Sequence, residues 1–166
     1  MDIVGKLPKA PEGKVFMLDM TDYLAKWTEA EAFWQFIDKR TTNFCESWGI
    51  KMITSTPVHP QANGQAESSN KIIINNLKKK LGSKKGKWAK ELPFVLWADR
   101  KTTKNATGQT PFSLVYGSEA VLPTEMAIPT ARSSLQNLES NKEIISEDLD
   151  TIDELRDIAR IKMETY

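Results

Sequence analysis

The chain has 166 residues, of which 40% are hydrophobic and five are Trp, which is typical of one globular domain and not of a disordered segment. One Cys (Cys45) and one His (His59) exclude a disulfide framework and a zinc finger. No apolar run approaches the length of a membrane span, and the first residues lack the apolar centre of a signal peptide. We therefore expect a soluble, intracellular protein, nuclear or cytoplasmic, without a membrane partner.

The net charge of +1 is the sum of two opposed parts. Residues 133–166 carry a net charge of −5 and residues 1–132 carry +6, most of it in residues 70–104, which alone carry +9. A basic block of this kind favours a polyanionic partner such as nucleic acid, although a solvated Lys-rich helix face explains it equally well. The run KKKLGSKKGK fits either a nuclear-import signal or a phosphate-contacting face.

The first third of the chain predicts strands followed by a helix. MDIVG predicts a first strand, and VFMLDMTD and KWTEAEAF predict an antiparallel pair joined by a short polar turn. Asp19 alternates with apolar neighbours in the second of these strands, so we expect it to face solvent. Apolar residues at helical spacing predict a helix over 35–48, and IKMITS predicts another short strand.

The rest of the chain predicts helices. One runs from about Ala66 to Leu81, with Glu67, Lys71 and Lys78 on the face beside its apolar stripe. A second begins near Trp88 and is reset by Pro93. Trp88 and Trp97 fit core positions of these helices. ATGQTPFSLVYG predicts a turn and a short apolar segment, and the acidic tail predicts an amphipathic helix carrying Leu138, Ile145, Leu149, Ile152, Leu155 and Ile158.

Four stretches of the chain carry a family resemblance. They are MDIVGKLPKAPEGKVFMLDMTDYLAKWTEAEAF, FCESWGIKMITSTPVHPQANGQAESSNK, KGKWAKELPFVLWADR and ATGQTPFSLVYGSEAVLP. In this order they resemble the integrase catalytic core of gypsy-type long-terminal-repeat retrotransposons, especially those of plants. The resemblance implies an α/β, ribonuclease H-like fold: a mixed sheet flanked by helices over residues 1–130, followed by an acidic helical linker or tail over 131–166.

The resemblance also implies a chemistry. In such enzymes three carboxylates hold two divalent metal ions, Mg²⁺ or Mn²⁺, which drive DNA strand transfer. On the family pattern the first acid falls on Asp2 and the last on Glu67, so these two are the expected catalytic and metal-binding residues. The expected DNA contacts lie on the same helix: Asn70, Lys71, Lys78 and Lys79. The expected partners are the element ends and target DNA, and further copies of the chain in a homo-oligomer.

The middle carboxylate of the family pattern is missing. It belongs to a TDNG-type motif at the end of a parallel strand, followed by a Gln-Phe pair that this chain carries at Gln35 and Phe36. The preceding strand ends at Phe33, which leaves no room for the roughly dozen residues that a crossover requires. The resemblance therefore implies an internal deletion between 33 and 35 that removes one parallel strand and its crossover helix.

Two functions follow from this gap. One is an integrase performing metal-dependent strand transfer, and the alternative is a non-catalytic remnant that still binds nucleic acid. We do not expect Asp38, Asp22 or Asp19 to replace the missing acid. Asp38 lies on the helix side of the Gln-Phe pair, Asp22 belongs to the TDY stretch of the second strand, for which the resemblance implies a structural role, and Asp19 is expected to face solvent. The chain is therefore expected to be marginally stable, impaired in metal binding and inactive in catalysis.

Overall fold

A computed structural model describes residues 2–34, 43, 46–47, 49, 64–120 and 138–166. These residues form two compact units. The first spans 1–21 and 28–97, and the second spans 22–27 and 98–166. Over the described residues the fold is mixed α/β, with a three-stranded antiparallel sheet and four α-helices.

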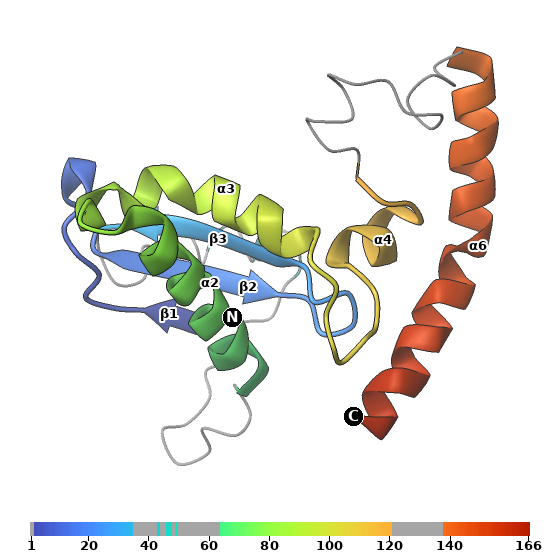
Figure 1. Cartoon of the computed structure of the whole chain (residues 1–166), viewed down its shortest axis with the longest axis horizontal. Helices are drawn as coiled ribbons and strands as arrows, with labels where there is room; N and C mark the ends of the chain where they lie inside the picture. The colour runs from blue at the N-terminus through green and yellow to red at the C-terminus, as the bar shows by residue number, and fades with distance from the viewer. Residues whose placement is uncertain (1, 35–42, 44–45, 48, 50–63, 121–137) are drawn as a thin grey trace. The chain divides into compact units, whose positions relative to one another are not determined.

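The first unit contains the sheet, whose strands are β1 (Asp2–Val4), β2 (Phe16–Thr21) and β3 (Thr28–Phe33) (Figure 1). They pair in the order β1-β2-β3, and both ladders are antiparallel. The three strands predicted in this part of the chain are therefore confirmed. Between β1 and β2 the chain makes a short 3₁₀ turn, η1 (Pro11–Gly13).

Two helices pack on the sheet (Figure 1): α2 (Gly64–Leu81) and, after the 3₁₀ turn η3 (Lys85–Lys87), α3 (Trp88–Arg100). The predicted stripe of α2 is confirmed, since Ala66, Ile73 and Leu77 are buried. Each such side chain contributes roughly 1.5–3 kcal/mol by leaving water, except the small Ala. The core cluster joins both helices to the sheet and the first loop: Ala10, Met17, Ala32, Ile73, Leu77, Trp88, Leu92, Val95 and Leu96.

Two expectations about α3 are wrong. Pro93 lies inside a continuous helix instead of resetting it. Proline removes one i to i−4 hydrogen bond, but Leu92 and Val95 are buried on either side of it, and their packing holds the helix together. Trp88 occupies a core position as predicted, and its Nε1 donates to the Pro8 carbonyl at 2.7 Å. Trp97 is instead 39% exposed.

The second unit contains the short helix α4 (Pro111–Tyr116) and the long helix α6 (Leu138–Thr165). The Thr110 hydroxyl accepts the Ser113 N–H at 3.0 Å and begins α4, while Gly117, at φ 79°, ends it in the left-handed conformation. Leu114 and Ala159 are buried together between the two helices. Arg156 adds a hydrogen bond from its Nε to the Leu114 carbonyl at 3.1 Å.

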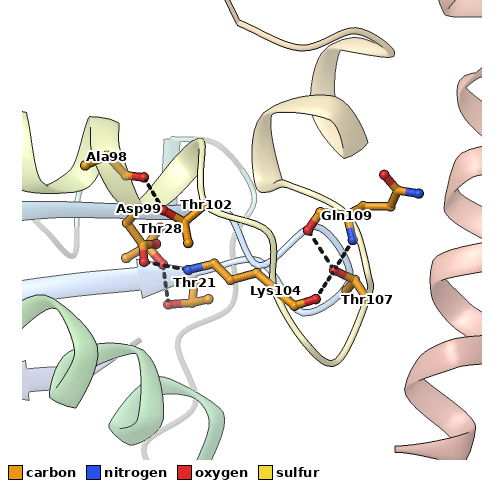
Figure 2. A network of polar contacts seen from close by, with 8 residues as sticks. All are labelled: Thr21, Thr28, Ala98, Asp99, Thr102, Lys104, Thr107 and Gln109. Atoms are coloured by element: carbon orange, nitrogen blue, oxygen red, sulfur yellow. Dashed lines mark hydrogen bonds and ion pairs between the residues drawn. The ribbon is translucent and has the colours of Figure 1, made fainter.

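A polar network shapes the loop before α4 (Figure 2). Lys104 Nζ lies 2.5 Å from Asp99 Oδ1, and both side chains are largely buried. The Thr107 hydroxyl donates to the Gln109 carbonyl at 3.2 Å. Figure 2 also shows the hydroxyls of Thr21 and Thr28, 3.2 Å apart in the first unit. The contacts of Lys104 and Thr107 give partners to polar groups of this loop.

The amphipathic prediction for α6 holds in part. Ile152 is buried and Leu155 is half-buried, but Leu149 and Ile158 are half or more exposed. Ala159, which the predicted stripe omits, is fully buried. The side chains of Leu138 and Ile145 lie outside the described residues. Which residues of α6 are buried is thus decided by close contact with α4 and not by side-chain size.

Several predictions concern residues that the structure does not describe. They include most of the helix over 35–48, the strand over 50–55 and the domain boundary between 130 and 131. The deletion near residue 34 and the parallel strand that it removes also stay predictions. Within the described ranges, no helix combines the length and apolar character needed to cross a lipid bilayer.

Candidate functional site

Two carboxylates face each other across the first ladder of the sheet. Asp2 on β1 is the direct partner of Asp19 on β2. Side chains of directly opposed residues share one face of an antiparallel sheet, with their Cβ atoms roughly 5 Å apart. Met17 lies two residues before Asp19, and both side chains are fully buried. The face that carries the two acids is therefore the face that packs on the core.

Helix α2 completes this site from the other side. Asn70 lies in the buried stripe of α2, where it is 5% exposed, and its Nδ2 donates to Asp2 Oδ2 at 2.7 Å. Because α2 contacts both β1 and β2, the amide is held between the helix and the two acid-bearing strands. One strand acid and one helix amide, 68 residues apart in the chain, are thus joined directly.

Burial dominates the electrostatics of Asp19. The pKa of its carboxyl is raised from 3.8 to about 6, chiefly by loss of water; the Asn70 amide acts against this rise and the Asp2 carboxylate adds to it. Asn70 lies close enough to act on Asp19, yet its Nδ2 is directed to Asp2. Within the described part of the chain, neither oxygen of Asp19 has a hydrogen-bond partner of ordinary geometry. Our expectation that Asp19 faces solvent is therefore wrong.

Glu67 lies on the first turn of α2, three residues before Asn70, and its side chain is exposed. The structure thus places the two predicted metal ligands on elements that contact each other, β1 and α2. Among the described residues, however, no group of three or more His, Cys, Asp and Glu side chains is arranged to hold a metal ion. Metal binding by Asp2 and Glu67 stays a prediction.

The predicted DNA contacts on α2 divide into two kinds. Lys71, Lys78 and Lys79 are exposed, whereas Asn70 is buried against Asp2. Lys80, which follows them, forms an ion pair with Glu91 at 2.8 Å and lies over the Phe94 ring. Lys80 thus links α2 to α3, and the other three lysines extend from the helix into solvent.

Asp19 is the site residue that the sequence analysis missed. Its strand alternates strictly, and the same alternation that buries Met17 also buries Asp19 two residues later. Counting from Met17 as a core residue would have placed Asp19 on the buried face. Asp22, considered alongside it, is structural as expected, because its Oδ1 accepts the Ala25 N–H at 2.6 Å in the turn between β2 and β3.

The chain is similar to parts of retroviral and retrotransposon Pol polyproteins. It is 31% identical over 88 residues to the Pro-Pol polyproteins of simian foamy virus type 3 and type 1, covering 53% of this chain and 8% of each polyprotein. It is 25% identical over 154 residues to the retrovirus-related Pol polyprotein from transposon 412 of Drosophila melanogaster, covering 74% of this chain and 12% of that protein. No family model matches the chain.

Proposed function

We propose that the chain is an integrase-type domain derived from the Pol polyprotein of a gypsy-type retrotransposon, with a ribonuclease H-like fold, and that it binds DNA. Similarity to Pol polyproteins supports the origin of the chain. The order of three antiparallel strands followed by helices over the described residues supports the fold. The integrase assignment rests on the motifs quoted above, from MDIVG to TGQTPFSLVYG.

The observation that carries this proposal is the hydrogen bond from Asn70 to Asp2. It fixes β1, which carries the first expected acid, against α2, which carries the last one at Glu67. Two distant acids on a strand and on a neighbouring helix are the arrangement that the resemblance implies.

DNA binding is assigned to the exposed face of α2. At 100° per residue, Lys71 and Lys78 lie within a few tens of degrees of Glu67 on the helical wheel. Both lysines are exposed, so their ammonium groups can reach phosphates without loss of core packing. Contacts of this kind bind the DNA backbone irrespective of sequence and weaken steeply with salt.

A divalent ion, Mg²⁺ or Mn²⁺, is expected beside Asp2 and Glu67. When bound, it would supply the activation of a hydroxyl and the stabilisation of a leaving oxygen in phosphoryl transfer. The donor set suits such an ion, because Asp2 and Glu67 supply hard carboxylate oxygens and the Asp19 carboxylate opposite Asp2 is buried without a partner among the described residues. The middle carboxylate of the resemblance is missing, so binding without strand transfer is the first candidate. The Asp19 carboxylate beside Asp2 favours strand transfer as the second candidate.

DNA binding is tested by anisotropy of a labelled duplex in EDTA over a range of salt concentrations. A K71A/K78A double variant should reduce the slope of log affinity against log salt by about 2, since each phosphate contact contributes about 0.9. The K6A/K9A double variant is the control, because both lysines are exposed on the loop after β1 and the charge change is the same. An equal reduction of the salt slope in the two double variants, or DNA binding that does not depend on salt, would contradict the proposal.

The two candidates are separated by strand transfer on labelled element-end DNA with Mn²⁺. Absence of product from a chain that binds DNA supports the non-catalytic remnant. Product that is lost in an E67Q variant supports the enzyme, because the substitution removes a charge from an exposed side chain without disturbing the core.

A further inference from the structure

The two buried polar side chains of this site have unused oxygens. Asp19 Oδ1 and Oδ2 and Asn70 Oδ1 are buried and have no hydrogen-bond partner within the described residues. Asp19 is 0% exposed and Asn70 is 5% exposed. Buried polar atoms are nearly always paired, and one left without a partner is costly to the fold. Three such atoms on two neighbouring side chains indicate a missing positive partner.

Asp2 brings a third group to the same place. It lies directly opposite Asp19 in the ladder, and its Oδ2 accepts the Asn70 amide. The two carboxylates and the amide oxygen therefore come from three different elements, β1, β2 and α2. Asp2 is only half-buried, so solvent reaches part of this residue.

We propose that Asp2, Asp19 and Asn70 bind one divalent cation of the Mg²⁺ and Mn²⁺ class. Two facing carboxylates without a counter-ion repel each other, and a dication between them removes that repulsion. The ligands are hard oxygens, which these ions prefer, and the exposed side of Asp2 leaves room for the waters that Mg²⁺ retains. Asp19 then supplies the second carboxylate from β2, independently of the middle carboxylate that the resemblance implies to be deleted.

This inference rests on the proposed function for the choice of metal ion, whereas the ligands follow from the contacts described here. It differs from the predicted ligand pair in one respect that can be tested. The predicted pair is Asp2 with Glu67, and the site inferred here is Asp2 with Asp19. Glu67 is exposed, so an ion held by Asp19 does not depend on it.

The test is a titration of the full chain with Mn²⁺ alone, in which binding is detected by the loss of the electron paramagnetic resonance signal of the free ion. The wild type should bind one Mn²⁺, and D19N should bind it at least about tenfold more weakly. E31Q is the matched control, because Glu31 is an exposed carboxylate on β3, and its affinity should equal that of the wild type. E67Q should also keep its affinity. D19L, whose side chain suits the apolar surroundings, provides a second variant, and circular dichroism checks that each variant is folded.

Three results would overturn the inference: no binding by the wild type up to millimolar Mn²⁺, unchanged affinity in both Asp19 variants, or a loss in E67Q alone. The last would assign the ion to Asp2 and Glu67. DNA binding in EDTA is measured on the same samples, because the α2 lysines need no ion to contact phosphates. Salt-dependent DNA binding without Mn²⁺ binding supports the proposed function and contradicts the cation site. Mn²⁺ binding without salt-dependent DNA binding supports the cation site and contradicts the proposed DNA binding.

Discussion

Asp2 and Asp19 are paired residues of the β1–β2 ladder, and the amide of Asn70 donates to Asp2 at 2.7 Å. Like charges directly opposite each other destabilise a sheet, and here one of the two is fully buried. The neutral amide can approach the pair without adding charge. We therefore expect the stability of the first unit to depend on pH.

The first prediction is that Asp19 destabilises the metal-free chain as the pH rises. Because burial raises its pKa from 3.8 to about 6, the folded state favours the protonated acid. The stabilisation is fully present below 3.8 and is lost as the pH rises through about 6. The full shift corresponds to about 3 kcal/mol, and roughly half of it is lost between about pH 5 and pH 7.5.

The measurement is urea denaturation in EDTA at both pH values. D19N should be more stable than the wild type at the higher pH, and its advantage should shrink at the lower pH. E31Q has the same charge change on an exposed residue and should show no such dependence. If the free energy of unfolding of D19N changed with pH as much as that of the wild type, the prediction that Asp19 is buried and becomes charged in this range would be contradicted.

The second prediction concerns the amide that connects α2 to β1. N70A removes the donor to Asp2 and leaves a small void in the buried stripe, so the free energy of unfolding should fall by about 1–3 kcal/mol. N75A is the control, because Asn75 is an exposed Asn on the same helix. Since Ala is the better helix former, N75A should be neutral or slightly stabilising. Equal effects of the two substitutions would show that the Asn70 hydrogen bond contributes nothing.

The third prediction concerns the ion pair between Lys104 and Asp99 in the second unit (Figure 2). D99N keeps the shape of the side chain but leaves a largely buried ammonium without its counter-charge, so we expect a loss of about 2–4 kcal/mol. D157N breaks the exposed ion pair between Asp157 and Arg160 and should cost less than about 0.5 kcal/mol. The comparison is made by thermal and urea denaturation. A small loss in D99N would mean that water reaches the pair.

The fourth prediction is that Thr110 fixes the start of α4. T110A removes the side chain that accepts the Ser113 N–H, which should cost about 1 kcal/mol. T110S keeps the hydroxyl and should recover most of that loss. T103A, at an exposed Thr in the preceding loop, is the control. If T110S were as unstable as T110A, the methyl group and not the cap would be responsible.

Local patterns were sufficient for most of the first unit. Strict alternation predicted β2 and β3, and the spacing of Ala66, Ile73 and Leu77 predicted the buried side of α2. Such patterns succeed because each strand or helix presents one face to the core. They say nothing of which distant elements meet, so the hydrogen bond from Asn70 to Asp2 could not be predicted.

The errors have physical causes of the same kind. Alternation with apolar neighbours predicts that Asp19 faces solvent, but the buried face of β2 is the one that carries Met17, two residues before it. A core position on its helix is predicted for Trp97, yet its place on α3 leaves it 39% exposed. In both cases the local pattern does not decide which face of the element meets the core.

Strand β1 has three residues, and one of its three pairs with β2 is the Asp2–Asp19 pair. Local opening of this ladder separates the two carboxylates and breaks the hydrogen bond from Asn70 to Asp2, so the charge of Asp19 contributes to its free energy. Backbone amides of the β1–β2 ladder should therefore exchange with solvent deuterium at rates that follow the charge of one buried carboxyl. The opening equilibrium of β1 should therefore respond to whether the Asp19 carboxyl opposite Asp2 is protonated or charged.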